Sequence, residues 1–417
     1  MPQAGSALRI PGFRIFFITY LLAMMADNIE HVISYTVAFD RFHSTALEGF
    51  AVISHWVPFL LGSVAVGGLN DRYDSRRIIQ CGMALFILAS TGWGVFFATD
   101  ALTIPACCAL LVVHGCAGVL WQTSSQMLLY DIVGPENLQS AVRLNATARY
   151  LGVLVGPMVG SALLAIGPTP GIWINTLFFT PLLLWLIRAP YGKKFRAAGV
   201  AGAKRAVRGF ADILQTLRDI KHVPVLGVML LLGGSASFFI GNSYQAAMPE
   251  FAHDLGYGRE QAFYYFLLFL CDAAGALIAG VLLETSRKLL PIAPRNALTI
   301  SLLWALSIGA FALNRNYPVA LVLLFFAGFF ELSFSSMVQT IVQLNAPNDI
   351  RGRVLGLFNM ASLGLRAFSG AVGLTGAVFS VHYTLAIAAG CFVVITLVRL
   401  VTYRPEVPPQ VPVARVH

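Results

Sequence analysis

Apolar stretches long enough to cross a lipid bilayer recur along the whole 417-residue chain. A helix needs about 20 apolar residues to span roughly 30 Å of hydrocarbon, whereas a barrel strand needs only about ten. These lengths predict an all-α integral membrane protein with twelve transmembrane helices. We expect the helices to begin near Phe13, Leu47, Ile78, Leu102, Leu138, Gly171, Val223, Gln261, Leu290, Pro318, Val354 and His382. Charged residues make up only 11% of the chain, which excludes an ordinary soluble domain.

The distribution of basic residues predicts the orientation of the chain in the membrane. If the N-terminus is cytoplasmic, most of the 28 Lys and Arg residues lie in cytoplasmic loops, tails or helix ends, whereas Arg41, Arg259 and Arg315 lie outside. This bias follows the positive-inside rule. We therefore expect a multi-pass membrane protein with both termini in the cytoplasm. The net charge of +9 is explained by this topology and not by nucleic-acid binding.

A basic polar segment divides the chain into two parts. Residues 1–188 are predicted to form an N-terminal six-helix bundle, residues 189–222 a cytoplasmic linker, and residues 223–417 a C-terminal six-helix bundle. The linker contains an amphipathic helical pattern with apolar side chains at Phe210, Ile213, Leu214 and Leu217. We expect this helix to lie against anionic head groups on the inner membrane surface.

An internal repeat relates the two predicted bundles. The segment SSQMLLYDIVGPENLQSAV (124–142) resembles SSMVQTIVQLNAPNDIRGRV (335–354), and shorter similarities recur at nearly the same offset. Duplicated halves of this kind are common in transporters, where the substrate site lies between the repeats. The sequence therefore predicts two pseudo-symmetric bundles with a cavity between them.

The loop after the second predicted helix reads GGLNDRYDSRR (67–77). A glycine at Gly67 permits close helix approach, and the Asp71 carboxylate can accept from backbone amides. Three cations, Arg72, Arg76 and Arg77, can pair with carboxylates on a neighbouring helix end. A plain basic turn would explain the same residues.

This loop resembles the G-x-L-x-D-R-x-G-R-R motif of the major facilitator superfamily. Gly67, Asp71 and Arg72 match in register, whereas Asp74 stands where a glycine belongs. The loop NAPNDIRGRVLGL and residues 13–77 are similar to the subgroup of bacterial siderophore exporters and macrolide efflux proteins. The resemblance implies a transporter of the bacterial inner membrane whose loop latches the cytoplasmic side of the outward-facing state. It does not identify the substrate.

The fifth predicted helix contains GVLVGPMVGS. Gly152, Gly156 and Gly160 recur every four residues and form one smooth face for close helix packing. Pro157 removes one backbone hydrogen bond and permits a bend. The run is similar to a motif associated with antiporters in the family, and it favours export.

Ionisable residues interrupt the first predicted helix in LLAMMADNIEHVISY (21–35). At 100° per residue, Asp27, Glu30 and His31 share one face. Each ionised side chain left in the bilayer centre would cost at least about 2.5 kcal/mol, so the group needs water or partners. His114 occupies a position on the fourth helix where the family often has arginine, and it titrates near neutral pH.

Further polar groups lie at mid-helix depth elsewhere. The resemblance implies that the helices carrying them surround or flank a central cavity. Carboxylates in excess of cations suit proton transfer, although paired structural struts would account for the arginines equally well. His55, beside Trp56, is predicted to lie at the membrane interface. The candidate substrate and proton site comprises Asp27, Glu30, His31, His114, Arg149, Asn242, Gln245, Asp272, Glu331 and Arg366.

The leading hypothesis is a monomeric, proton-coupled secondary transporter that exports a siderophore or drug-like molecule by alternating access. Its expected partners are this small molecule, protons and the lipid bilayer. Import of a small anionic metabolite remains an alternative, as does carriage of a metal ion or chelate on Asp27, Glu30 and His31. The sequence has neither GxxxxGK[ST] nor HExxH, so we expect no enzyme activity and no cofactor. The six cysteines show no CxxC spacing.

Overall fold

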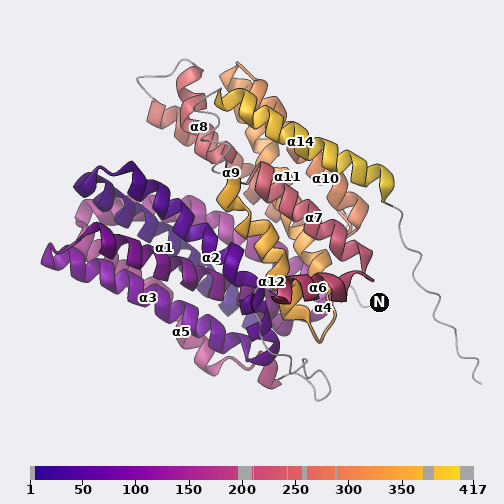
Figure 1. Ribbon diagram of the computed structural model, residues 1–417, viewed down its shortest axis with the longest axis horizontal. Helices are drawn as coiled ribbons and strands as arrows, with labels where there is room; N and C mark the ends of the chain where they lie inside the picture. Colours follow the sequence, from indigo (N-terminus) through magenta and orange to yellow (C-terminus); the bar gives the residue numbers. More distant parts are fainter. Residues whose placement is uncertain are drawn as a thin grey trace, which may run out of the picture.

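The computed structural model describes residues 5–195, 209, 211–241, 243–255, 261–286, 289–369 and 380–403, and no strand occurs among them. Figure 1 shows the helices arranged in two groups. The first group contains η1 (Ala7–Arg9), α1 (Pro11–Phe42), α2 (Thr45–Arg72), α3 (Ser75–Thr99), α4 (Ile104–Ile166) and α5 (Pro168–Arg188). After η2 (Lys193–Phe195) and α6 (Ala211–Ile220), the second contains α7 (Pro224–Phe239), α8 (Ser243–Asp254), α9 (Gln261–Thr285), α10 (Pro294–Leu313), α11 (Tyr317–Asn345), α12 (Arg351–Asn359), η3 (Met360–Gly364) and α14 (Val381–Thr402).

Ten helices within the described ranges are long and apolar enough to cross a membrane. One of them, α4, has 63 residues and would be about 95 Å long if straight, far more than one bilayer crossing. Its backbone leaves helical geometry at Gly134, where φ is 67° and ψ is 176°. This break lies between the predicted fourth and fifth helices, so α4 runs as two arms. The total of twelve crossings remains a prediction.

The predicted seventh helix is interrupted in a similar way. α7 ends at Phe239 and α8 begins at Ser243, and Gly241 between them has a left-handed φ of 43°. A glycine adopts this conformation without the strain that a side chain would bring. Tyr244, in the first turn of α8 directly after the interruption, is fully buried.

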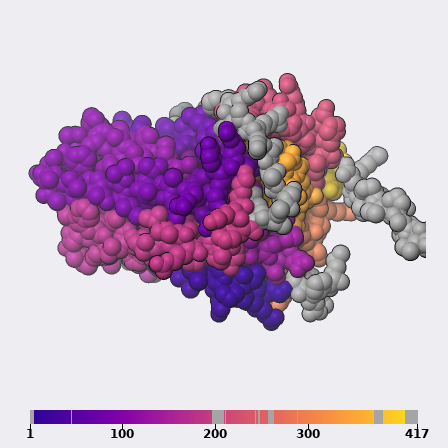
Figure 2. Space-filling model, turned by 90° about the horizontal axis from the view of Figure 1, so that it is seen from below, coloured from indigo at the N-terminus to yellow at the C-terminus, as the bar shows by residue number. Residues whose placement is uncertain are grey.

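Most apolar core residues pack within one group or the other. The largest core joins α7, α8, α10, α11, α12 and α14 and also includes Val64 of α2 and Met127 of α4, whereas two others join helices of the first group. A small cluster packs Ala146 and Tyr150 of α4 against α9 and α11 and so connects the groups. Figure 2 shows the same division, with indigo to magenta atoms mainly at one end and salmon to yellow atoms mainly at the other.

The glycine face of α4 packs directly on α1. A Cβ atom built at Gly152 would lie 2.6 Å from Met24 Cβ, and one at Gly156 would lie 2.6 Å from Asn28 Cβ. Gly160 approaches the next turn of α1, and Pro157 lies within the same stretch of α4. This contact holds the second arm of α4 against the helix that carries Asp27.

The two groups meet at the end of the molecule where α2, α6 and α12 lie together, and they diverge toward α8 (Figure 1). In the linker, α6 buries Asp212, Thr216 and Ile220, whereas Leu214 is 62% exposed and faces away. Phe210, part of the predicted amphipathic pattern, lies outside the described residues.

Candidate functional site: a charged cavity between the bundles

A cavity of about 570 Å³ lies between the two groups of helices. Its walls come from α1, α2 and α4 on one side and from α8, α11 and the segment after η3 on the other. Of the predicted site residues, its lining includes Asp27, His31, Arg149, Gln245, Glu331 and Arg366. The structure therefore brings residues far apart in the sequence to one space.

On the first-half side, His114 joins two carboxylates. Its Nε2 lies 2.7 Å from Asp27 Oδ1, and its Nδ1 lies 2.8 Å from Glu30 Oε1. The Ser90 hydroxyl donates to the other oxygen of Glu30. Asp27, Glu30 and His114 are at most 5% exposed, so α1, α3 and α4 enclose this network while Asp27 still reaches the cavity wall.

His55, which was not among the predicted site residues, lies beside two of them in the structure. Its ring centroid is 5.0 Å from that of His31 and 6.0 Å from that of His114, and it lines the central cavity. The reason is a close helix contact, because a Cβ atom at Gly115 would lie 2.1 Å from the Ser54 carbonyl oxygen. This glycine lets α4 approach α2 beside both histidines.

On the second-half side, the Tyr244 hydroxyl connects two carboxylates. It lies 2.8 Å from Glu331 Oε2 and 3.2 Å from each carboxylate oxygen of Asp272. The Gln245 amide donates to Asp272 over 3.1 Å. Two buried carboxylates linked by one hydroxyl can share protons between them. The predicted substrate residue Asn242 lies outside the described residues.

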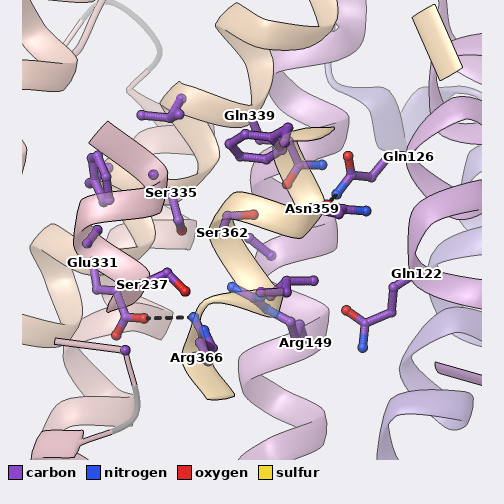
Figure 3. A pocket seen from close by; sticks show the side chains of 18 of the residues that line it. Gln122, Gln126, Arg149, Ser237, Glu331, Ser335, Gln339, Asn359, Ser362 and Arg366 are labelled. Carbon is purple, nitrogen blue, oxygen red and sulfur yellow. Dashed lines mark hydrogen bonds and ion pairs between the residues drawn. The ribbon is translucent and has the colours of Figure 1, made fainter. Parts of the chain in front are cut away.

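A smaller pocket of about 80 Å³ adjoins the cavity and shares part of its lining. Figure 3 shows Arg149, Arg366 and Gln122 around it, with Glu331 beside Arg366. Arg366 Nη2 is 3.9 Å from Glu331 Oε1. Arg149 lies over the Tyr150 ring, and no ion pair joins it to a carboxylate in the described part of the chain. Arg149 thus offers a positive charge to an anionic group in the cavity.

The smaller pocket also contains a contact between the two groups of helices. Gln126 of α4 donates to the Asn359 side-chain oxygen of α12 over 2.7 Å, and the Asn359 amide donates to Thr123 over 3.1 Å. Figure 3 shows these amides meeting deep in the pocket. These uncharged hydrogen bonds can separate and reform at modest cost.

At the closed end, Asp71 joins α2 to α12. Its carboxylate accepts from the Gly352 amide at 2.6 Å and from the Arg353 amide and Nη1 at 3.2 Å each. Gly67 permits this approach, because a Cβ atom there would lie 2.2 Å from the Gly352 carbonyl oxygen. Arg353 also lies 3.6 Å from Asp212 of α6, so the linker helix takes part in the closure.

The three arginines of the same loop lie elsewhere. Arg76 pairs with Asp74 at 3.0 Å and donates to the Ala189 carbonyl, and Arg77 donates to Gln80. Arg72 lies over the Tyr73 ring. All these contacts stay within the first half and its connection to the linker, so among the described contacts only Gly67 and Asp71 of this motif bridge the two halves.

Three residues with the contacts described above are not among those that the sequence predicts. Arg353 lies near the end of the repeat segment 335–354 and pairs with Asp71. The internal repeat is the only sequence pattern that draws attention to it. Tyr244 precedes the predicted site residue Gln245, and the structure buries it between two carboxylates. His55 could have been found only through the glycine contact of α4 with α2.

The sequence of the chain is similar to a family model and to proteins of known function. The family model described as Major Facilitator Superfamily matches residues 15–371. The chain is 26% identical over 421 residues to a protein named enterobactin exporter from Shigella boydii serotype 4, covering 96% of this chain and 95% of that one. It is 25% identical over 361 residues to the enterobactin exporter of Salmonella choleraesuis, covering 84% and 81%.

Two solved structures share the architecture. The human organic anion transporter TETRAN aligns with a TM-score of 0.73 and 16% identity, covering 94% of this chain and 99% of that chain. The Escherichia coli fucose:proton symporter aligns with a TM-score of 0.71 and 14% identity, covering 94% and 98%. At these identities the structural likeness supports the fold alone. With the apolar spans, the comparisons indicate a multi-pass membrane protein.

Proposed function

Because the chain belongs to the major facilitator superfamily, we propose that it is a proton-coupled secondary transporter that exports a small organic molecule by alternating access. It is a transporter and not an enzyme. We place it in the bacterial inner membrane as a monomer of two six-helix bundles, residues 1–188 and 223–417. Residues 189–222 form the cytoplasmic linker in this proposal.

The observation that carries this proposal is the cavity lined by ionisable groups from both halves. Asp27 reaches it from the network with Glu30 and His114, and Glu331 reaches it from the network with Asp272. Buried carboxylates in a hydrated space can exchange protons with water, whereas the same groups facing lipid would be costly. Alternating closure at Asp71 and at the opposite end would expose them to one side at a time.

A siderophore is the substrate class that we favour. Two enterobactin exporters align with most of the chain. The guanidinium of Arg149, which has no carboxylate partner among the described residues, can bind an anionic oxygen of such a molecule. Hydroxyl or amide donors of the same molecule can bind the carboxylates of Asp27 and Glu331. Export by proton antiport follows if these donors compete with protons for the carboxylates.

Transport by purified protein in vesicles tests the proposal. A stability screen with siderophores, drug-like compounds, amino acids and metal ions at two pH values would identify a ligand, whose uptake is then measured under an imposed pH gradient. We expect Asp27→Asn and Glu30→Gln each to lower proton-driven uptake by about 100-fold, because an amide cannot take up the transferred proton.

Glu136→Gln provides a matched control, because Glu136 is exposed on α4 away from the cavity. It should transport at the wild-type rate. Proton-driven uptake that is unchanged in both Asp27→Asn and Glu30→Gln would refute the assignment of proton coupling to this network. A pH gradient that drives no uptake of any bound ligand by the wild-type protein would refute proton coupling altogether.

A further inference from the structure

Three histidines and one aspartate converge on the first-half wall of the cavity. Asp27 and His31 of α1, His55 of α2 and His114 of α4 each offer one ligand atom, and these atoms all lie within 4.8 Å of one another. The His31 and His114 ring centroids are 4.8 Å apart, and those of His31 and His55 are 5.0 Å apart. Three imidazoles so close together would repel one another if all were protonated.

Two of the ring nitrogens have no hydrogen-bond partner. His31 Nε2 and His55 Nδ1 are both inaccessible to solvent and accept or donate no hydrogen bond among the described residues. A buried polar atom without a partner costs about 1–3 kcal/mol. A metal ion would bind the lone pairs of these nitrogens and remove that cost.

The third histidine is held as metal-binding histidines are held in proteins. Glu30 Oε1 lies 2.8 Å from His114 Nδ1, and the Ser90 hydroxyl fixes the same carboxylate from its other side. This contact turns His114 Nε2 toward Asp27, 2.7 Å away. A carboxylate bound to the outer nitrogen of a ligating histidine orients the ring and raises its basicity.

We propose that Asp27, His31, His55 and His114 form a binding site for a divalent late first-row transition metal ion, with Glu30 orienting His114. Three imidazole nitrogens and one carboxylate oxygen suit Zn²⁺ and its neighbours, whereas Ca²⁺ and Mg²⁺ prefer oxygen ligands. Ligand atoms about 2.1 Å from a tetrahedral ion lie about 3.4 Å apart. The observed spacing therefore needs only a small contraction of side chains.

The position of the site determines how it would behave. All four ligands come from α1, α2 and α4, so the site is complete without any residue of the second half. Asp27, His31 and His55 line the central cavity, which gives an ion a path to the cluster. The site therefore keeps its ligands whichever end of the protein is closed, and it stands independently of the exported molecule proposed above.

Binding of Zn²⁺ alone to the full-length protein tests the proposal. The protein is purified without a polyhistidine tag, stripped with a chelator and titrated with Zn²⁺ by calorimetry, and its bound metal is counted after gel filtration. We expect one retained Zn²⁺ per chain and a higher thermal unfolding midpoint with Zn²⁺. Co²⁺ should give the absorption of a tetrahedral nitrogen and oxygen site without a thiolate charge-transfer band, which excludes the six cysteines as ligands.

Matched variants separate this site from adventitious binding. His31→Gln and His55→Gln should each weaken Zn²⁺ binding by at least about 100-fold, and Glu30→Gln by about 10- to 100-fold. His253→Gln should bind as the wild type does, because the His253 side chain is 65% exposed and lies outside the cluster. Equal Zn²⁺ binding by wild-type, His31→Gln and His55→Gln proteins would overturn the proposal. Absence of retained Zn²⁺ in the wild-type protein would overturn it without any variant.

Discussion

The contact of Asp71 with α12 should control which end of the protein is closed. In Asp71→Asn, the side-chain oxygen can still accept from the Gly352 amide, but the new amide nitrogen faces the donors of Arg353. The side chains of Asp71 and Arg353 are each 1% exposed, so water cannot replace the lost partner in the closed state. The substitution therefore destabilises this closure more than it destabilises the open form.

The size of the effect follows from the type of contact. Breaking a buried ion pair by removing one charge costs about 3–5 kcal/mol. Asp212 remains 3.6 Å from Arg353 and keeps part of its charge compensated, which favours the lower end of this range. About 3 kcal/mol corresponds to a shift of about 100-fold in the ratio of the two states.

Distances between spin labels at the diverging end measure that ratio. Phe39 near the end of α1 and Tyr383 at the start of α14 are both exposed, and they can be replaced by labelled cysteines in a background without the native cysteines. We expect Asp71→Asn to enrich the short-distance population, because opening at α12 accompanies closure at this end. An unchanged distance distribution would refute the reasoning.

Asp74→Asn is the control for this experiment. Burial alone would raise the pKa of Asp74, but hydrogen bonds from the Arg76 side chain and amide outweigh it and hold the pKa below its usual range. The pair is therefore charged at neutral pH, and its contribution is lost only as the pH falls through that lowered pKa. Since both residues lie in the first half, Asp74→Asn should leave the distances unchanged. An equal shift in both variants would mean that general damage to the loop, and not the Asp71 contact, controls closure.

Two further predictions concern packing and the second-half network. Gly156→Val should lower the thermal unfolding midpoint through about 1–3 kcal/mol of overpacking against Asn28, whereas Gly227→Ala, with open space around it, should not. A Gly156→Val protein as stable as wild type would contradict the close contact. Tyr244→Phe removes the hydroxyl that bridges to Glu331 and should slow proton-driven uptake by at least about tenfold without loss of folded protein on gel filtration. Wild-type uptake by this variant would show that the hydroxyl takes no part.

The existence of the helices could be predicted because a membrane crossing leaves a local signal in the sequence. The predicted start at Gln261 coincides with that of α9, and the start near His382 lies one residue from that of α14. Breaks within helices leave a weaker signal in the sequence. α4 continues past Gly134 without a loop, and only three residues separate α7 from α8, because glycine allows a sharp local change of direction.

The site could be predicted only in part, because its geometry depends on contacts between helices. Asp27, Glu30 and His31 share a helix face, and this follows from periodicity alone. That His114 lies between the first two of them depends on how α4 packs against α1. His55 joins them only because a glycine brings α4 close to α2. Distances between side chains on different helices leave no periodic pattern in the sequence.

The charges around the cavity also constrain the direction of coupling. Protonation of Glu331 would remove the carboxylate beside Arg366 and leave more positive charge facing the cavity, so proton binding and anion binding would strengthen each other. A substrate that donates hydrogen bonds to Glu331 or Asp27 would instead compete with protons. Antiport needs such competition, and symport needs the reverse. A ligand that binds more tightly at higher pH therefore supports export by proton exchange, whereas one that binds more tightly at lower pH supports the import of an anion.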